Sequence, residues 1–185
     1  MVDSDGSRSV DNNSIKTFDI QVNQVNDIPI ASINSIAPNP ATKGEGRAPP
    51  VDQYTIGYWP FRESTGKETI DESGQKNNAT LKGSQFETGI WDSSVYFDGN
   101  SDYLYVTKGN ALSDLGDNDF TLEAWIYPTR SMTSGQHSII RNDGDYNLFV
   151  NNGHLRAEVW HGEDVYWAQS DDTYMSSTNT WYHVA

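Results

Sequence analysis

The sequence predicts an all-β protein built as an antiparallel sandwich. From residue 54 onward, short runs rich in aromatic and β-branched residues alternate with clusters of Gly, Asn, Asp and Ser at close spacing. No long stretch repeats its apolar residues with the helical period of about 3.6, so helix should be scarce. The six Trp and ten Tyr can fill a sandwich core, since each large ring buries roughly 150–250 Å².

The chain is acidic and contains no cysteine. Its formal net charge of −14 at pH 7 disfavours nucleic acid and anionic membrane surfaces as partners, because both require a basic face. An acidic surface suits a protein kept soluble by self-repulsion, or one that collects divalent cations. The lack of Cys excludes a disulfide framework, a thiolate nucleophile and Cys-ligated zinc. No apolar run of about 18 residues is present to insert into a membrane.

Residues 1–30 have the pattern of the end of another β domain. Phe18, Ile20 and Val22 alternate with polar residues, which predicts an extended, half-buried strand. One strand alone makes no sheet, so this segment is expected to be a separated piece or an added edge strand. Residues 31–52 concentrate Pro and Gly and are predicted to form an extended linker.

The sandwich is expected to begin near residue 53. Ile56, Tyr58 and Phe61 suit a first strand, and residues 71–78 consist of turn-forming residues. The turn at 98–101 predicts a hairpin joining a strand at 95–97 to one at 103–106. Further strands are expected at 138–140, 146–150, 155–160 and 165–168, with a two-strand turn at 151–153.

Residues 120–127 carry large side chains on both faces. Phe120 and Leu122 alternate with Glu123, Trp125 and Tyr127, which predicts a central strand whose second face is covered or lines a ligand site. Four tryptophans are expected to pack in the core, namely Trp59, Trp91, Trp125 and Trp181.

Four motifs occur in an order that resembles the laminin-G-like jelly rolls of the concanavalin A-like lectin/glucanase superfamily. They lie at residues 54–62, 71–83, 95–106 and 119–128. The resemblance covers roughly residues 54–185 and implies a two-sheet jelly-roll sandwich over 53–185. Relatives continue past the closing Trp-x-His-Val-Ala motif at 181–185, so the sandwich is expected to be incomplete at its C-terminus.

The strand before the linker, followed by Val25-Asn-Asp-Ile-Pro29, looks like the end of a cadherin-like repeat. In such linkers an Asn-Asp pair ligates calcium between domains, which would make Asn26 and Asp27 candidate ligands. The alternative is a strand end followed by a simple turn.

Calcium is a possible cofactor at a second place. The loop 141–145 precedes a strand, as an acidic loop does in calcium-binding pentraxins, and this resemblance implies Asn142, Asp143 and Asp145 as ligands. The alternative is a solvated turn. A further acidic turn, Asp98-Gly-Asn-Ser-Asp102, is expected to serve structural capping.

Catalysis is tested by comparison with glucanases of the same fold, which carry Glu-x-Asp-x-x-Glu on one strand. Glu158 and Glu163 keep the spacing of the two glutamates, but Trp160 replaces the aspartate. An offset of five residues points side chains to opposite faces of a strand, and the intervening His-Gly resembles a turn. We therefore expect no enzymatic activity.

Sugar binding is the remaining possibility for these strands. Trp160, Tyr166 and Trp167 could stack on pyranoside rings, or they could serve core packing. The chain is thus predicted to be a non-catalytic recognition or adhesion module for a glycan or an extracellular protein. We expect it at the cell surface or outside the cell, beside flanking domains of one long polypeptide. The alternatives are an accessory module of a glycoside hydrolase and a structural spacer.

Overall fold

The computed structural model describes the backbone of Ile20–Gln21 and Ile30–Ala31 and, further along, residues 51–107, 112–113, 115, 119–173 and 175–185. Asn26, Asp27 and most of the expected linker lie outside the described residues. The chain divides into two compact units, one of Met1–Pro40 with Gly116–Ala185 and one of Ala41–Leu115. We call them the larger and the smaller unit.

Apart from the 3₁₀ conformation of Leu112 and Leu115, the elements formed by the described residues are β-strands, and their pairings are antiparallel. The predicted all-β class is confirmed, and the antiparallel sheets agree with a jelly-roll sandwich. Near the N-terminus, β1 (Ile20–Gln21) pairs with β2 (Ile30–Ala31). Among the described residues, no helix is long and apolar enough to cross a bilayer.

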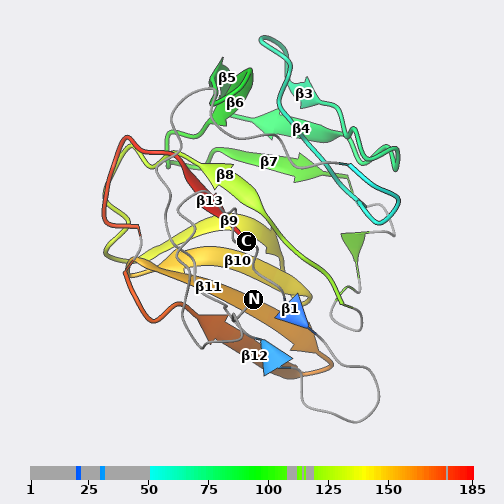
Figure 1. The fold of residues 1–185 in the computed structure, drawn as a ribbon. Coiled ribbons are helices and arrows are strands. Elements are labelled where there is room, and N and C mark those ends of the chain that lie inside the picture. The colour runs from blue at the N-terminus through cyan, green and yellow to red at the C-terminus, as the bar shows by residue number, and fades with distance from the viewer. Residues whose placement is uncertain are drawn as a thin grey trace, which may run out of the picture. The chain divides into compact units, whose positions relative to one another are not determined.

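The main sheet of the larger unit is a four-stranded meander (Figure 1). Its order is β12-β11-β10-β9, made by β9 (Gln136–Asn142), β10 (Tyr146–Asn151), β11 (His154–His161) and β12 (Asp164–Gln169). Asn152 and Gly153 connect β10 to β11 with φ of 50° and 86°, as a type I′ turn requires at both central positions. The turn predicted at 151–153 is therefore confirmed.

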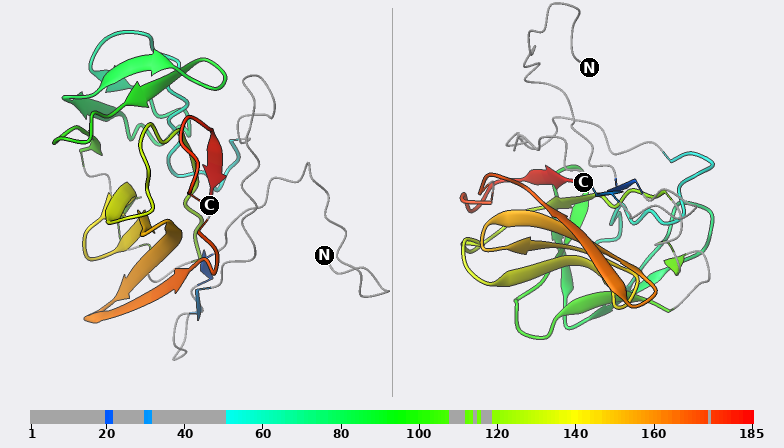
Figure 2. Two further views of the ribbon diagram at one scale, coloured as in Figure 1. Left: turned by 90° about the vertical axis from the view of Figure 1, so that its left-hand side faces the viewer. Right: turned by 90° about the horizontal axis from the view of Figure 1, so that it is seen from below.

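One face of the meander forms a core. Leu148, Val150, Leu155, Ala157 and Val159 alternate along β10 and β11 and are at most 1% exposed. Strand alternation places the residues between them on the opposite face, which we call the outer face. The two further views show these strands running side by side (Figure 2).

A second sheet of the larger unit pairs β8 (Ala124–Ile126) with β13 (Tyr182–Val184). Tyr182 and Val184 are buried, and they lie opposite Ile126 and Ala124. Trp125 and His183 form the remaining pair of the register, so they lie on the other face of this sheet. The prediction that four tryptophans are core residues is wrong in part, because Trp59, Trp91, Trp125 and Trp181 are each only half-buried.

The smaller unit holds two sheets. One has the order β3-β4-β7, from β3 (Glu68–Thr69), β4 (Ala79–Lys82) and β7 (Tyr103–Val106), and the other pairs β5 (Gln85–Thr88) with β6 (Ser93–Tyr96). The hairpin predicted across 98–101 is wrong, since β6 pairs with β5 and β7 pairs with β4. The strand predicted over 54–61 is also wrong, because residues 55–62 have no strand assignment. The turn chemistry at 98–102 instead caps itself: Asn100 N–H donates to Asp98 and Asp98 N–H to Asp102, at 2.7 and 3.0 Å.

Asp71 organises the loops of the smaller unit. It is buried, and its carboxylate accepts the backbone N–H groups of Tyr58, Ser73 and Asn77 at 2.8–2.9 Å. Burial raises the pKa of Asp71, but these hydrogen bonds from Ser73, Tyr58 and Asn77 outweigh it and hold the pKa below its usual value. Residues 54–62 are therefore held by a side chain rather than by strand pairing.

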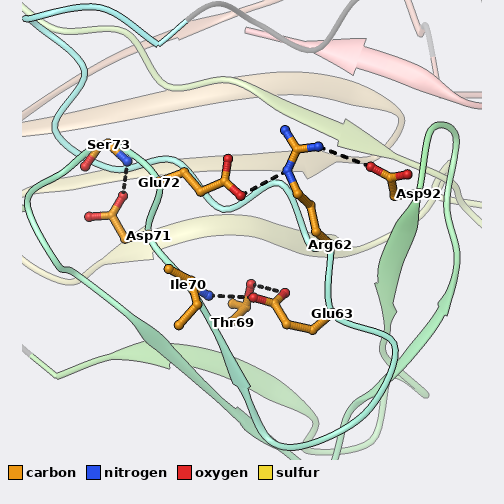
Figure 3. A network of polar contacts seen from close by, with 8 residues as sticks. All are labelled: Arg62, Glu63, Thr69, Ile70, Asp71, Glu72, Ser73 and Asp92. Atoms are coloured by element: carbon orange, nitrogen blue, oxygen red, sulfur yellow. Dashed lines mark hydrogen bonds and ion pairs between the residues drawn. The ribbon is translucent and has the colours of Figure 1, made fainter.

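An ion-pair network surrounds this loop (Figure 3). Arg62 contacts Glu72 at 3.0 Å and Asp92 at 3.4 Å, and all three side chains are exposed. Nearby, Glu63 accepts hydrogen bonds from the Thr69 hydroxyl and the Ile70 N–H. Exposed ion pairs contribute little to stability, so the buried Asp71 is the dominant member of this group.

Candidate functional site

The outer face of the meander combines aromatic and charged side chains. The register places Glu158 opposite Asn147 on β10 and opposite Trp167 on β12. The next row places Arg156 opposite Phe149 and Gln169. Because directly opposite residues lie on one face of a sheet, these side chains form one continuous surface.

Trp167 is the most exposed ring of this face. It is 55% exposed although it lies on a regular strand. The guanidinium carbon of Arg156 lies 4.2 Å from its ring centroid and 5.9 Å from that of Phe149. A cation over an aromatic face is attracted by the quadrupole of the ring. Arg156 thereby holds Trp167 in place and helps to cover Phe149, which is only 6% exposed.

The charge of Arg156 is balanced on the same face. Its Nη2 lies 3.0 Å from Oε1 of Glu158, and the two side chains are 21% and 17% exposed. Its Nε also donates to Oε1 of Glu158 at 3.0 Å. Charge-assisted bonds of this kind are strong and directional. Both polar groups are therefore fixed beside the indole before any ligand arrives.

Asn147 adds an unsatisfied acceptor. Among the buried side-chain oxygens and nitrogens of the described residues, its Oδ1 is the atom without a hydrogen-bond partner. A buried acceptor without a donor costs about 1–3 kcal/mol. Asn147 lies between Arg141 and Glu158 in the register. The middle of the outer face thus carries a buried polar atom that the described residues leave unsatisfied.

The structure brings two of the three predicted sugar-binding residues together. Trp160 lies opposite Val165, so it shares the outer face with Trp167. Tyr166 lies opposite the buried Val159 and therefore belongs to the inner face. A single surface made by all three rings does not form, because adjacent strand residues point to opposite sides.

The predicted calcium loop is held by bonds within itself. The Asn142 amide donates to the Asp145 carboxylate at 3.0 Å, and Arg141 forms an ion pair with Asp143. Asp145 is buried, whereas the Asp143 side chain is 72% exposed. In the described residues, no group of three or more His, Cys, Asp or Glu side chains is arranged to hold a metal ion. The loop offers two carboxylates of the six to eight oxygens that calcium takes, so a fit would need carbonyls and water.

The two glutamates considered as a catalytic pair lie in different elements, one in a strand and one in a turn. Glu158 lies within β11 and pairs with Arg156, whereas Glu163 lies in the turn that joins β11 to β12. Gly162 in this turn has φ of 62°, a conformation that favours glycine. The predicted turn is thus confirmed at Gly162, whereas His161 is still the last residue of β11.

Sequence reasoning missed Arg156, Phe149 and Asn147. Each is paired with a site residue only through cross-strand register, which no local pattern states. A usable signal was present: polar residues alternate with buried ones from His154 to Trp160, which marks the even positions as outward-facing.

Part of the chain matches a known protein family. Residues 98–185 match the family model of the concanavalin A-like lectin/glucanases superfamily. Searches of the curated proteins and of the solved structures gave no match. The superfamily match spans β7 to β13 and therefore includes the whole outer face. Domains of this superfamily commonly bind carbohydrates or proteins.

Proposed function

We propose that this chain is a non-catalytic recognition module that binds a neutral glycan on the outer face of β9–β12. The observation that carries the proposal is Trp167, more than half exposed yet fixed by Arg156. Such a ring offers an apolar surface at little entropic cost, because its position is set before binding.

The chemistry around Trp167 suits a sugar. The apolar face of a pyranose can pack on the indole, while Glu158 and the Arg156 guanidinium can bind hydroxyl groups. The net charge of −14 would repel an acidic polysaccharide, which favours a neutral one.

Recognition without hydrolysis is supported by the position of the acidic groups. A retaining glycosidase needs two carboxyl groups about 5–5.5 Å apart, one of them free to give a proton. Glu158 is engaged by Arg156, and Glu163 lies in a turn. We place the module at the cell surface or outside the cell, in adhesion, with other domains of one polypeptide beside it.

The test is a calorimetric titration that measures the affinity of the protein for neutral oligosaccharides of glucose, mannose, galactose and xylose. Trp167→Ala should weaken binding at least tenfold. Tyr103→Ala is the matched control, because Tyr103 is 50% exposed on a strand of the smaller unit. No binding by the parent protein would favour a structural spacer and overturn the proposal.

A further inference from the structure

A second aromatic surface lies on the sheet of β8 and β13. We call it the β8–β13 face and define it by Glu123, Trp125, Tyr127, Trp181 and His183. The two strands run beside each other (Figure 1). Trp125 lies opposite His183, while the intervening Ala124 and Ile126 lie opposite the buried Val184 and Tyr182. Alternation along both strands places Tyr127 and Trp181 on the same side as Trp125.

The rings of this face form two contacting pairs. The Trp125 and His183 ring centroids are 5.1 Å apart, and those of Tyr127 and Trp181 are 5.2 Å apart. Successive residues on one side of a strand are about 6.6–6.8 Å apart, so the pairs follow each other along the sheet. Tyr127 is 41% exposed, and both tryptophans are half-buried. The array is therefore open to solvent in part.

One end of the array carries a fixed polar pair. Nε2 of His183 lies 3.1 Å from Oε2 of Glu123. The His183 side chain is 10% exposed, whereas Glu123 is 35% exposed. The imidazole is thus held against the Trp125 ring, and part of the carboxylate still reaches solvent. This combination supplies an apolar surface and a hydrogen-bonding group at its edge.

We propose that the β8–β13 face is a second binding site, for consecutive pyranose units of a neutral oligosaccharide. The inference takes its ligand class from the proposed function but rests on different residues. The planes within the two pairs are tilted by 38° and 50°, so each pair can offer one ring face to one of two successive sugars. An aromatic cage for a methylated ammonium group would instead surround its ligand. Glu123 and His183 bind the hydroxyl groups of the terminal sugar.

Binding at the two sites can be distinguished by NMR of the unmodified protein, through the indole N–H signals of its six tryptophans. Cellohexaose, mannohexaose and xylohexaose are the probes, and Trp→Phe variants assign the signals. We expect Trp125 and Trp181 to shift on titration with at least one probe, and Trp59 and Trp91 to stay in place. Shifts of Trp160 and Trp167 alone would overturn the second site and keep the proposed function.

Shifts of Trp125 and Trp181 alone would support this site and overturn the first. No shift with any probe, or shifts only with tetramethylammonium or a basic peptide, would overturn both. Binding strength gives a second readout: in a Trp167→Ala background, Glu123→Gln should weaken the remaining affinity several-fold and Trp181→Ala at least tenfold. Unchanged affinity in both variants would also overturn the second site.

Discussion

Arg156 stacks on Trp167, with its guanidinium carbon 4.2 Å from the centroid of the ring, and binds Glu158 at 3.0 Å with the same group. One side chain on β11 thus fixes both the apolar and the acidic part of the outer face. The planar guanidinium can do both at once, whereas an ammonium group cannot stack in the same way.

Replacing Arg156 tests this arrangement. Arg156→Lys keeps a positive charge for Glu158 but loses the planar contact, which contributes about 0.5–1 kcal/mol at an exposed site. We expect oligosaccharide affinity to fall several-fold, as measured by calorimetry, with little change in melting temperature. Arg62→Lys, at an exposed arginine of the smaller unit that also pairs with a glutamate, is the control. Equal effects of both variants would contradict a specific role for Arg156.

Asp71 is predicted to hold the loops of the smaller unit. Asp71→Asn replaces a charged acceptor of three N–H groups by an amide whose NH₂ group faces donors. The free energy of unfolding should fall by about 2–3 kcal/mol, as measured by urea denaturation at pH 7. Asp92→Asn, at the exposed end of the Arg62 network, should change it far less.

Low pH should remove the contribution of the Asp71 carboxylate to stability. The pKa of Asp71 is lowered in the folded state, so its contribution is fully present above the unfolded pKa of about 3.9. It is lost as the pH falls through the lower folded value. Below about pH 4 the difference in stability between the parent protein and Asp71→Asn should therefore shrink. A difference that stays constant from pH 7 to pH 3 would contradict this role.

Gly89 has no room for a side chain. A Cβ at this position would lie 2.2 Å from the carbonyl oxygen of Ser93, where the chain turns between β5 and β6. Because the obstacle is backbone, Gly89→Ala should destabilise the protein by about 1–3 kcal/mol, read as a lower melting temperature. Thr88→Ala at the exposed neighbour should stay within about 0.5 kcal/mol. Similar melting temperatures for both variants would refute the contact.

Calcium binding by the 141–145 loop stays a prediction. With two carboxylates, the affinity should lie near the weak range of about 10⁻⁴–10⁻³ M, so millimolar calcium should raise the melting temperature. Asp143→Ala with Asp145→Ala should abolish the rise, whereas Asp164→Ala, an exposed acid outside the loop, should keep it. No rise in the parent protein, or an equal rise with magnesium, would refute a calcium site.

Local chemistry in the sequence was enough for several features. The turn at Asn152-Gly153 was predictable because few residues adopt positive φ twice in succession. The strand β11 was predictable because outward-facing and buried residues alternate along it. The self-capping of Asp98 and Asn100 was also predictable, since Asp and Asn side chains bond to backbone N–H groups nearby.

Strand partners were not predictable from the same patterns. The turn at 98–101 looked like a hairpin, yet β7 pairs with β4 and β6 with β5. Residues 54–61 looked like a strand, yet the distant Asp71 holds them through the Tyr58 N–H. The pairing of β7 with β4 and the bond between Tyr58 and Asp71 both join residues far apart in the chain, so a local sequence pattern does not predict them.

The sequence by itself determined that the protein is made of strands and which residues alternate along each one. Tertiary structure alone decided which rings meet. Tyr166 and Trp167 are neighbours in the chain but lie on opposite faces, whereas Tyr127 and Trp181 are distant in the chain and lie 5.2 Å apart. The physical reason is that alternation fixes the side of a strand on which a residue lies, while cross-strand register fixes its neighbours there.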